Sequence, residues 1–96
     1  MGKRYFVYIL RNHSGNFYIG ITSNLTKRVW EHKNKLVKSY TEKYNIDQLI
    51  YYEVYQEPLA AIAREKQLKN WNRKKKILLI TKENPKFEEI TLDQVV

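Results

Sequence analysis

The chain has no cysteine among its 96 residues. This absence excludes disulfide bonds, thiolate zinc sites and thiol nucleophiles together. Any metal must then be held by oxygen or imidazole ligands, which favours a hard cation such as magnesium. The sequence also lacks an apolar run near the roughly 20 residues that a membrane span needs, and its first residues do not form a secretory signal. We therefore expect a cytoplasmic protein with no membrane partner.

Acidic residues are few beside the basic ones. Ten Asp and Glu stand against 18 Lys and Arg, which gives a formal charge of +8. Such a charge on a small chain points to a polyanionic partner, although a solvated surface is the simpler explanation. Basic residues concentrate in segments 27–38 and 64–76, whereas acids gather after residue 82. This uneven distribution favours nucleic acid over a membrane, because no basic segment also carries a wide apolar face.

The apolar pattern predicts a single α+β domain over residues 1–96. Two aromatic strands, 5–10 and 17–21, flank a turn-rich segment and predict an antiparallel hairpin. We expect helices over 25–35, 58–70 and 73–81, a third strand over 49–55, and a short tail element around 88–92. This order predicts a small three-stranded sheet with about three helices packed against it.

Tyr8 and Tyr18 fall on one face of the predicted hairpin, because side chains alternate along a strand. A five-residue loop from Arg11 to Gly15 would make them direct cross-strand partners. A three- or seven-residue loop would leave them on the same face but offset. Because the chain has eight tyrosines, packing explains each of these two, taken alone, better than catalysis does.

Two further groups stand out in the predicted helices. Arg28 and His32 lie four residues apart and share one helix face, and for this pair taken alone an ordinary solvated basic surface is a better explanation than chemistry. Glu65 has Ala61, Ile62 and other apolar residues as helical neighbours, so it belongs to the semi-buried side. A carboxylate there needs a partner. Either an internal Lys or Arg or a divalent metal would serve.

Several short motifs occur in a defined order. They are Phe6-Val7-Tyr8, Asn12, Tyr18-Ile19-Gly20, Asn24 to Arg28 followed by Glu31-His32, the segment 63–71, Leu79-Ile80, and Asn84-Pro85. Each is weak alone, but their order and spacing resemble the GIY-YIG nuclease domain, and among its members the small stand-alone bacterial proteins. The resemblance covers residues 4 to about 87. It departs at Phe6, where the signature has glycine, and at Ile21, where excision-repair relatives carry a lysine whose role does not transfer.

The resemblance implies an endonuclease that hydrolyses phosphodiester bonds with one divalent metal, leaving 5′-phosphate and 3′-hydroxyl ends. It implies six site residues. These are Tyr8 or Tyr18 as acceptor of the water proton, Arg28 as the group that lowers the phenol pKa and binds phosphoryl oxygens, His32 as partner of a tyrosine, Glu65 as ligand of Mg²⁺ or Mn²⁺, and Asn84 as a late supporting asparagine.

The expected partner is nucleic acid, with DNA as the substrate of a repair or processing reaction. The basic residues expected to bind it are Lys27, Lys33, Lys35, Lys69, Arg73 and Lys74. Two other functions fit the residues: a non-catalytic nucleic-acid-binding module of the same fold, and an interaction scaffold that binds no nucleic acid. Sequence specificity is expected to be low unless a weak homodimer forms, and the residues do not separate DNA from RNA.

Overall fold

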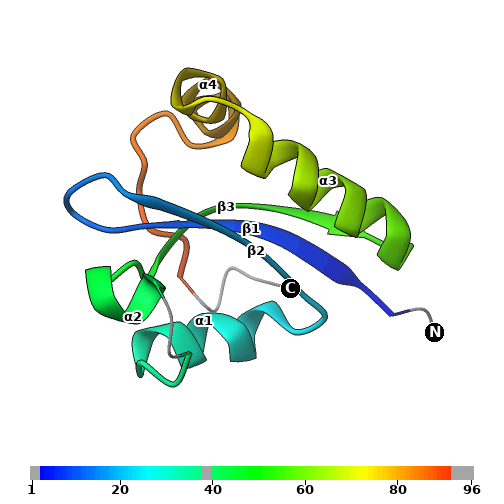
Figure 1. The fold of residues 1–96 in the computed structure, drawn as a ribbon, viewed down its shortest axis with the longest axis horizontal. Coiled ribbons are helices and arrows are strands. Elements are labelled where there is room, and N and C mark those ends of the chain that lie inside the picture. Colours follow the sequence, from blue (N-terminus) through cyan, green and yellow to red (C-terminus); the bar gives the residue numbers. More distant parts are fainter. Residues whose placement is uncertain (1–2, 38–39, 92–96) are drawn as a thin grey trace.

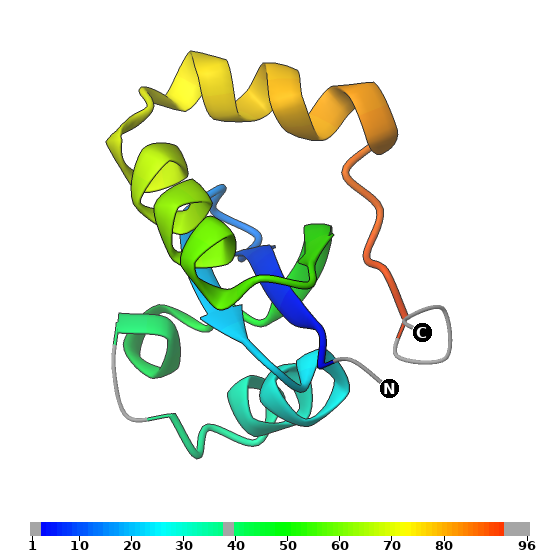
Figure 2. The same cartoon turned by 90° about the vertical axis from the view of Figure 1, so that its right-hand side faces the viewer.

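The computed structural model describes residues 3–37 and 40–91. Three strands form one antiparallel sheet: β1 (Tyr5–Arg11), β2 (Phe17–Thr22) and β3 (Gln48–Tyr55), in the spatial order β2-β1-β3. Helices α1 (Leu25–Lys33) and α2 (Tyr40–Tyr44) cover one face, and α3 (Pro58–Asn70) and α4 (Arg73–Glu83) cover the other (Figures 1 and 2). The α+β prediction is confirmed, with four helices in the described residues rather than three.

Strand β1 is the centre of the core because helices cover both of its faces. Val7 and Ile9 pack in one apolar cluster with residues of α3 and α4, and Phe6, Tyr8 and Leu10 pack in a second cluster with residues of α1. All five side chains are buried. An edge strand with one solvated face would alternate, whereas this strand is apolar throughout, as a strand buried on both faces requires.

The hairpin register differs from the direct tyrosine pairing that a loop over 11–15 would give. Tyr8 pairs with Gly20, and Tyr18 pairs with Leu10. The loop is 12–16 instead, closed by the Asn12 side chain, which accepts from the backbone N–H of residue 16 at 2.8 Å. The two tyrosines therefore share a face but are offset by two residues, as diagonal neighbours that long side chains can still join.

Helix boundaries follow capping signals in the sequence. Asn24 caps α1 and Asn72 caps α4, each with its side chain accepting a backbone N–H of the first turn. Pro58 opens α3, and Trp71 separates α3 from α4. The segment after residue 39, for which no element was predicted, forms the short helix α2. The expected tail element around 88–92 was wrong for residues 88–91, which form no regular element. Residue 92 lies outside the described part.

A cluster of charged and phenolic side chains on β3 binds helix α3 to the sheet. Arg64 donates from Nε and Nη2 to both carboxylate oxygens of Glu53, at 2.9 and 3.0 Å. Glu53 also accepts from the hydroxyls of Tyr51 and Tyr55. This bidentate pair holds Arg64 of α3 against the sheet. Ile62, expected on the semi-buried side, is instead 38% exposed.

Candidate active site

Tyr8, Tyr18 and His32 meet on the α1 face of the sheet near the edge strand β2. The His32 ring lies 5.9 Å from the Tyr8 ring and 5.4 Å from the Tyr18 ring, and the two tyrosine rings are 6.2 Å apart, all between centroids. Tyr8 is 1% exposed and His32 is 4% exposed. Residues from β1, β2 and α1 thus form one aromatic cluster.

His32 is buried, which corrects the simpler expectation of a solvated basic face shared with Arg28. Its Nε2 shares a hydrogen bond of 3.1 Å with the Tyr8 hydroxyl, and its Nδ1 shares one of 3.0 Å with Oγ1 of Thr41. Hydroxyl groups can donate or accept, so both neutral tautomers of the ring are satisfied. The arrangement is a short chain of groups along which a proton can move.

Burial raises the pKa of the Tyr8 phenol well above its usual value near 10, and neighbouring Tyr18 raises it further. The positive charge of Arg28 acts in the opposite direction, and the negative charge of Glu65 raises the pKa slightly. Tyr8 is therefore a neutral phenol at neutral pH. Its sensitivity to Arg28 and Glu65 also indicates that these charges, carried by α1 and α3, lie close enough to act on one hydroxyl.

Burial lowers the pKa of His32 below its usual value of about 6.5, and the Arg28 charge lowers it further, whereas Glu31 and Asp47 act in the opposite direction. Since the folded pKa lies below the unfolded one, His32 contributes stability that is fully present above pH ~6.5 and is lost as pH falls through the folded pKa.

We expect the midpoint of urea unfolding to fall as pH is lowered from ~7.5 to ~5, and to fall less in His32→Gln, because the buried imidazole must gain a proton. The matched control is His13→Gln, since His13 is exposed. Equal pH dependence in wild type and His32→Gln would show that His32 does not titrate in this way.

Gly20 allows Tyr8 to reach its position. A Cβ added at Gly20 would lie 2.5 Å from Cζ of Tyr8 and closer still to its hydroxyl oxygen. The tyrosine ring therefore crosses directly over the β2 backbone, which explains a glycine inside a strand. Because the Tyr8 ring is packed in the buried cluster against α1, it cannot swing aside to make room.

Gly20→Ala should lower the free energy of unfolding by about 1–3 kcal/mol, the cost typical of overpacking, and should break the Tyr8–His32 hydrogen bond. Urea denaturation measures the first effect, and Thr26→Ala on exposed α1 surface is a control. Wild-type stability in Gly20→Ala would mean that Tyr8 does not occupy this position.

Glu65 has the internal partner that the sequence allowed. Its carboxylate lies 3.0 Å from Nζ of Lys69, one helical turn away; the Glu65 side chain is 15% exposed and that of Lys69 is 52% exposed. Within residues 3–37 and 40–91, no group of three or more His, Cys, Asp or Glu is arranged to hold a metal. A magnesium ion bound through one carboxylate, water and substrate phosphate needs no such group, so Glu65 fits that mode.

Arg28 borders a shallow cavity at the start of α1. The cavity measures about 180 Å³ and is lined by Thr22, Ser23, Asn24, Lys27, Arg28 and Glu31. The Arg28 side chain is 39% exposed and its Nε lies 3.6 Å from Glu31, a long ion pair. Such a pair at the surface contributes little, so the guanidinium is free to bind an anion.

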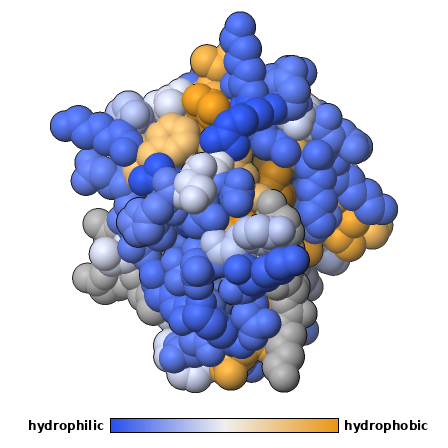
Figure 3. Space-filling model, turned by 60° about the vertical axis from the view of Figure 1, so that its left-hand side comes forward, coloured by the Kyte–Doolittle hydropathy of each residue, from blue (hydrophilic) through white to orange (hydrophobic). Residues whose placement is uncertain are grey.

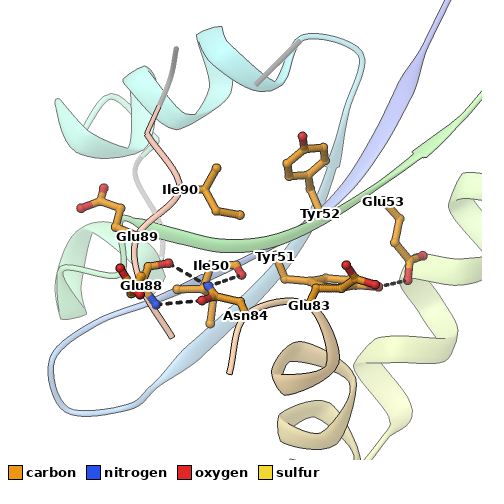
Figure 4. Close-up of a pocket in the computed structure, with 9 residues that line it drawn as sticks. All are labelled: Ile50, Tyr51, Tyr52, Glu53, Glu83, Asn84, Glu88, Glu89 and Ile90. Carbon is orange, nitrogen blue, oxygen red and sulfur yellow. Dashed lines mark hydrogen bonds between the residues drawn. The ribbon is translucent and has the colours of Figure 1, made fainter. Parts of the chain in front are cut away.

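Asn84 is separated from this cluster. It caps α4, and its side-chain amide donates to the carbonyls of Ile50 at 3.0 Å and Glu88 at 2.7 Å, which fastens the chain after α4 to β3 at the opposite edge of the sheet. It lines a cavity of about 630 Å³ together with four glutamates (Figure 4). These carboxylates would repel a polyanion, so this cavity does not suit nucleic acid.

The basic residues expected to bind nucleic acid are held in different ways. Lys33 pairs with Glu89, Lys35 with Asn45, and Lys69 with Glu65. Arg73 lies over the Phe17 ring but is exposed, as are Lys27 and Lys74. Figure 3 shows the face at the hairpin end as mainly hydrophilic, with apolar side chains as small separate patches.

Sequence reasoning missed two site residues. Thr41, 3% exposed, partners His32 from the unpredicted helix α2. Gly20 was noted in a motif, but not for its contact with Tyr8. A glycine inside an apolar strand is a signal of close approach, and it was available in the sequence. Nothing in the polar segment around Thr41 marked that residue.

The fold and this cluster define a class: a three-stranded antiparallel sheet with helices on both faces and a tyrosine pair beside an arginine-histidine helix, as in GIY-YIG nuclease domains. A family model described as the GIY-YIG catalytic domain matches residues 4–90. The chain therefore belongs to the GIY-YIG family, which implies a nuclease-type fold.

In the described part of the chain, no helix has the length and apolarity needed to cross a membrane.

Similar proteins place the chain among small stand-alone members. A UPF0213 protein of Staphylococcus saprophyticus is 31% identical over 81% of this chain and 95% of its own length. Another, from Clostridium perfringens, is 34% identical over 86% of this chain and 89% of its own length. The solution structure of a UPF0213 protein from Bacillus halodurans matches with a TM-score of 0.59 and 25% identity, over 88% of this chain and 90% of that one.

Proposed function

We propose that this protein is an endonuclease that hydrolyses phosphodiester bonds of DNA in a reaction dependent on Mg²⁺ or Mn²⁺. One observation carries the proposal: the buried Tyr8 hydroxyl shares a hydrogen bond of 3.1 Å with the buried His32, and the Tyr18 ring lies beside both groups. A packing tyrosine needs none of these neighbours. A phenol that passes on a proton needs an acceptor within hydrogen-bond reach, and His32 is such an acceptor.

In this proposal Tyr8 is a relay rather than a standing phenolate. Its raised pKa keeps the phenol protonated at rest. As the attacking water gives a proton to Oη of Tyr8, the phenolic proton passes to Nε2 of His32, which is neutral and able to accept it. Thr41 holds the far side of the imidazole in place. Tyr18 packs beside both groups and helps to exclude bulk water.

Arg28 and Lys27 are proposed to bind the phosphoryl oxygens at the cavity at the start of α1. A guanidinium offers two parallel donors to a phosphate, which lysine cannot. Its charge also favours the electron-rich oxygen that forms on Tyr8 as the proton moves. Both effects strengthen as negative charge builds at the phosphate, so they lower the barrier rather than only tighten binding.

Glu65 is the residue proposed to hold the divalent metal, with Lys69 released to solvent or to substrate phosphate. When bound, the cation supplies neutralisation of the scissile phosphate and stabilisation of the leaving 3′ oxygen. The Glu65–Lys69 ion pair also favours a second function, a non-catalytic nucleic-acid-binding module, because it gives the carboxylate a partner without metal.

The test is cleavage by the purified protein of single-stranded, duplex, flapped and junction DNA, and of duplex RNA, each with Mg²⁺, with Mn²⁺ and with EDTA. We expect cleavage of at least one DNA with metal and none with EDTA, leaving 5′-phosphate ends. Binding without cleavage of any substrate would support the binding module instead. Absence of both would leave neither function standing.

A further inference from the structure

Two arginines and two phenylalanines form a continuous stack at the hairpin end of the molecule. The guanidinium of Arg73 lies 4.6 Å from the centre of the Phe17 ring, Phe17 and Phe87 stack with centroids 6.2 Å apart and planes at 25°, and Arg11 lies 5.5 Å from the centre of Phe87. We call these four residues the arginine–phenylalanine stack. Its members come from β1, β2, α4 and the segment after α4.

The stack carries positive charge that no described carboxylate neutralises. The ion pairs in the described residues involve Arg28, Lys33, Arg64 and Lys69 as cations, and none involves Arg11 or Arg73. The buried Nε of Arg11 also has no hydrogen-bond partner among the described residues. Aromatic rings hold the two guanidinium planes, and exposed Arg73 keeps N–H groups able to bind an anion.

Helix α4 adds charge at the same place, against its own dipole. It begins with the four basic residues 73–76, and its first turn contains no acidic residue. Cations at a helix N-terminus are unfavourable, because the backbone N–H groups there already carry partial positive charge. Helix stability therefore gives no reason for this cluster. An anionic partner does give one, because the cations and the helix end would attract it together.

The position of the stack relates it to the candidate active site. Phe17 and Tyr18 are consecutive residues of β2, and they pack in the clusters on opposite faces of the sheet. Strand β2 is an edge of that sheet. A polyanion that lies across this edge would therefore meet the tyrosine cluster on one face and the stack on the other. Gly15, at φ +86°, forms the tight loop beside this stack, and a Cβ there would lie 3.0 Å from Nη2 of Arg73, which places the loop next to that guanidinium.

From these observations we propose that the arginine–phenylalanine stack and the start of α4 bind the phosphate backbone of the substrate nucleic acid, outside the segment that is cut. The stack is a second anchor that holds the strand across the β2 edge. This inference rests on the proposed function, since it takes a nucleic acid as the substrate. It requires no metal, because only arginine and lysine side chains and backbone N–H groups contact the phosphates.

The test is fluorescence anisotropy of labelled duplex DNA and duplex RNA of about 20 base pairs, a length that exceeds one small contact surface, in EDTA at several salt concentrations. Arg73→Gln should weaken binding about tenfold and reduce the magnitude of the slope of log affinity against log salt by about 1. Lys74→Gln should show a smaller loss in the same direction. Lys82→Gln, which removes one charge from the last turn of α4, is the matched control and should bind within about twofold of wild type.

The outcomes separate this inference from the proposed function. In one outcome, wild type binds and cleaves DNA, and all three variants (Arg73→Gln, Lys74→Gln and Lys82→Gln) bind as tightly as wild type with the same salt slope. That outcome refutes the second anchor and leaves the proposed nuclease activity standing. If wild type neither binds nor cleaves nucleic acid, both fall. Thermal melting of each variant checks folding, and exposed Lys74 supplies the answer if Arg73→Gln does not fold.

Discussion

Glu65→Gln should reduce metal-dependent cleavage by about three orders of magnitude, corresponding to about 4 kcal/mol of lost transition-state stabilisation. The amide keeps the shape of the carboxylate but not the charge that holds a divalent cation. Binding of nucleic acid in EDTA should be equal or tighter, because one negative charge near the phosphate is removed. Single-turnover cleavage and anisotropy measure the two effects separately.

Two controls show whether the effect belongs to Glu65 itself. Glu57→Gln removes the same charge at the start of the same helix, where the side chain makes no capping bond, and should cleave like wild type. Lys69→Gln removes the ion-pair partner of Glu65 and one expected phosphate contact, so it should bind DNA less tightly but keep metal-dependent cleavage at saturating DNA. Cleavage at the wild-type rate by Glu65→Gln would remove Glu65 from the proposed metal site.

Tyr8→Phe should lower the cleavage rate by about 10²–10⁴-fold, the range typical of a lost general acid or base. Tyr18→Phe should cost less, because Tyr8 and Thr41 already occupy both ring nitrogens of His32. Tyr18 thus has no direct route by which to pass a proton to the imidazole. The measurement is single-turnover cleavage at saturating enzyme, which reports the chemical step.

The free energy of unfolding separates the packing role of the Tyr8 ring from the hydrogen-bonding role of its hydroxyl. Phenylalanine preserves the packed ring but leaves Nε2 of His32 without its partner, a loss of about 1–3 kcal/mol for a buried polar group. The additional change His32→Gln in the Tyr8→Phe background should then cost less than His32→Gln alone. A larger rate loss in Tyr18→Phe than in Tyr8→Phe would reverse the assignment of the proton acceptor.

The sequence predicted the fold and the faces of the sheet better than it predicted contacts. Alternation along a strand is a local rule, so it correctly placed Tyr8 and Tyr18 on one face. Their register depends on where the loop closes, which the Asn12 side chain decides by capturing residue 16. A shift of two residues keeps the face and changes the partner, and no periodicity reports it.

Burial was harder to predict than helical spacing. The four-residue spacing of Arg28 and His32 holds, yet His32 lies 4% exposed because the helix rotates that position toward Tyr8. His32 also continues the helical spacing of the apolar Leu25 and Val29, which predicts the buried face, but its polar ring favours solvent until its hydrogen-bond partners are known. Thr41 was missed for the same reason, since the short helix that carries it has no apolar period.

The remaining differences between prediction and structure concern where residues of the later motifs lie relative to the sheet. Glu65 and Asn84 both belong to motifs of the resemblance, but a motif states order along the chain and not which edge of a sheet a residue reaches. The charge of Glu65 acts on Tyr8, whereas the Asn84 amide bonds to Ile50 on β3 at the other edge. The tertiary hydrogen bonds of Asn84 place it at that edge, and local propensity carries no information about them.

The most direct test of the proposed activity is the single-turnover rate of wild type on its best DNA substrate as a function of Mg²⁺ or Mn²⁺ concentration. We predict no cleavage in EDTA, a rate that rises with metal and then saturates, and products with 5′-phosphate and 3′-hydroxyl ends. Cleavage that continues undiminished in EDTA, or a protein that binds DNA and cuts none at any metal concentration, would contradict a metal-dependent phosphodiester hydrolase.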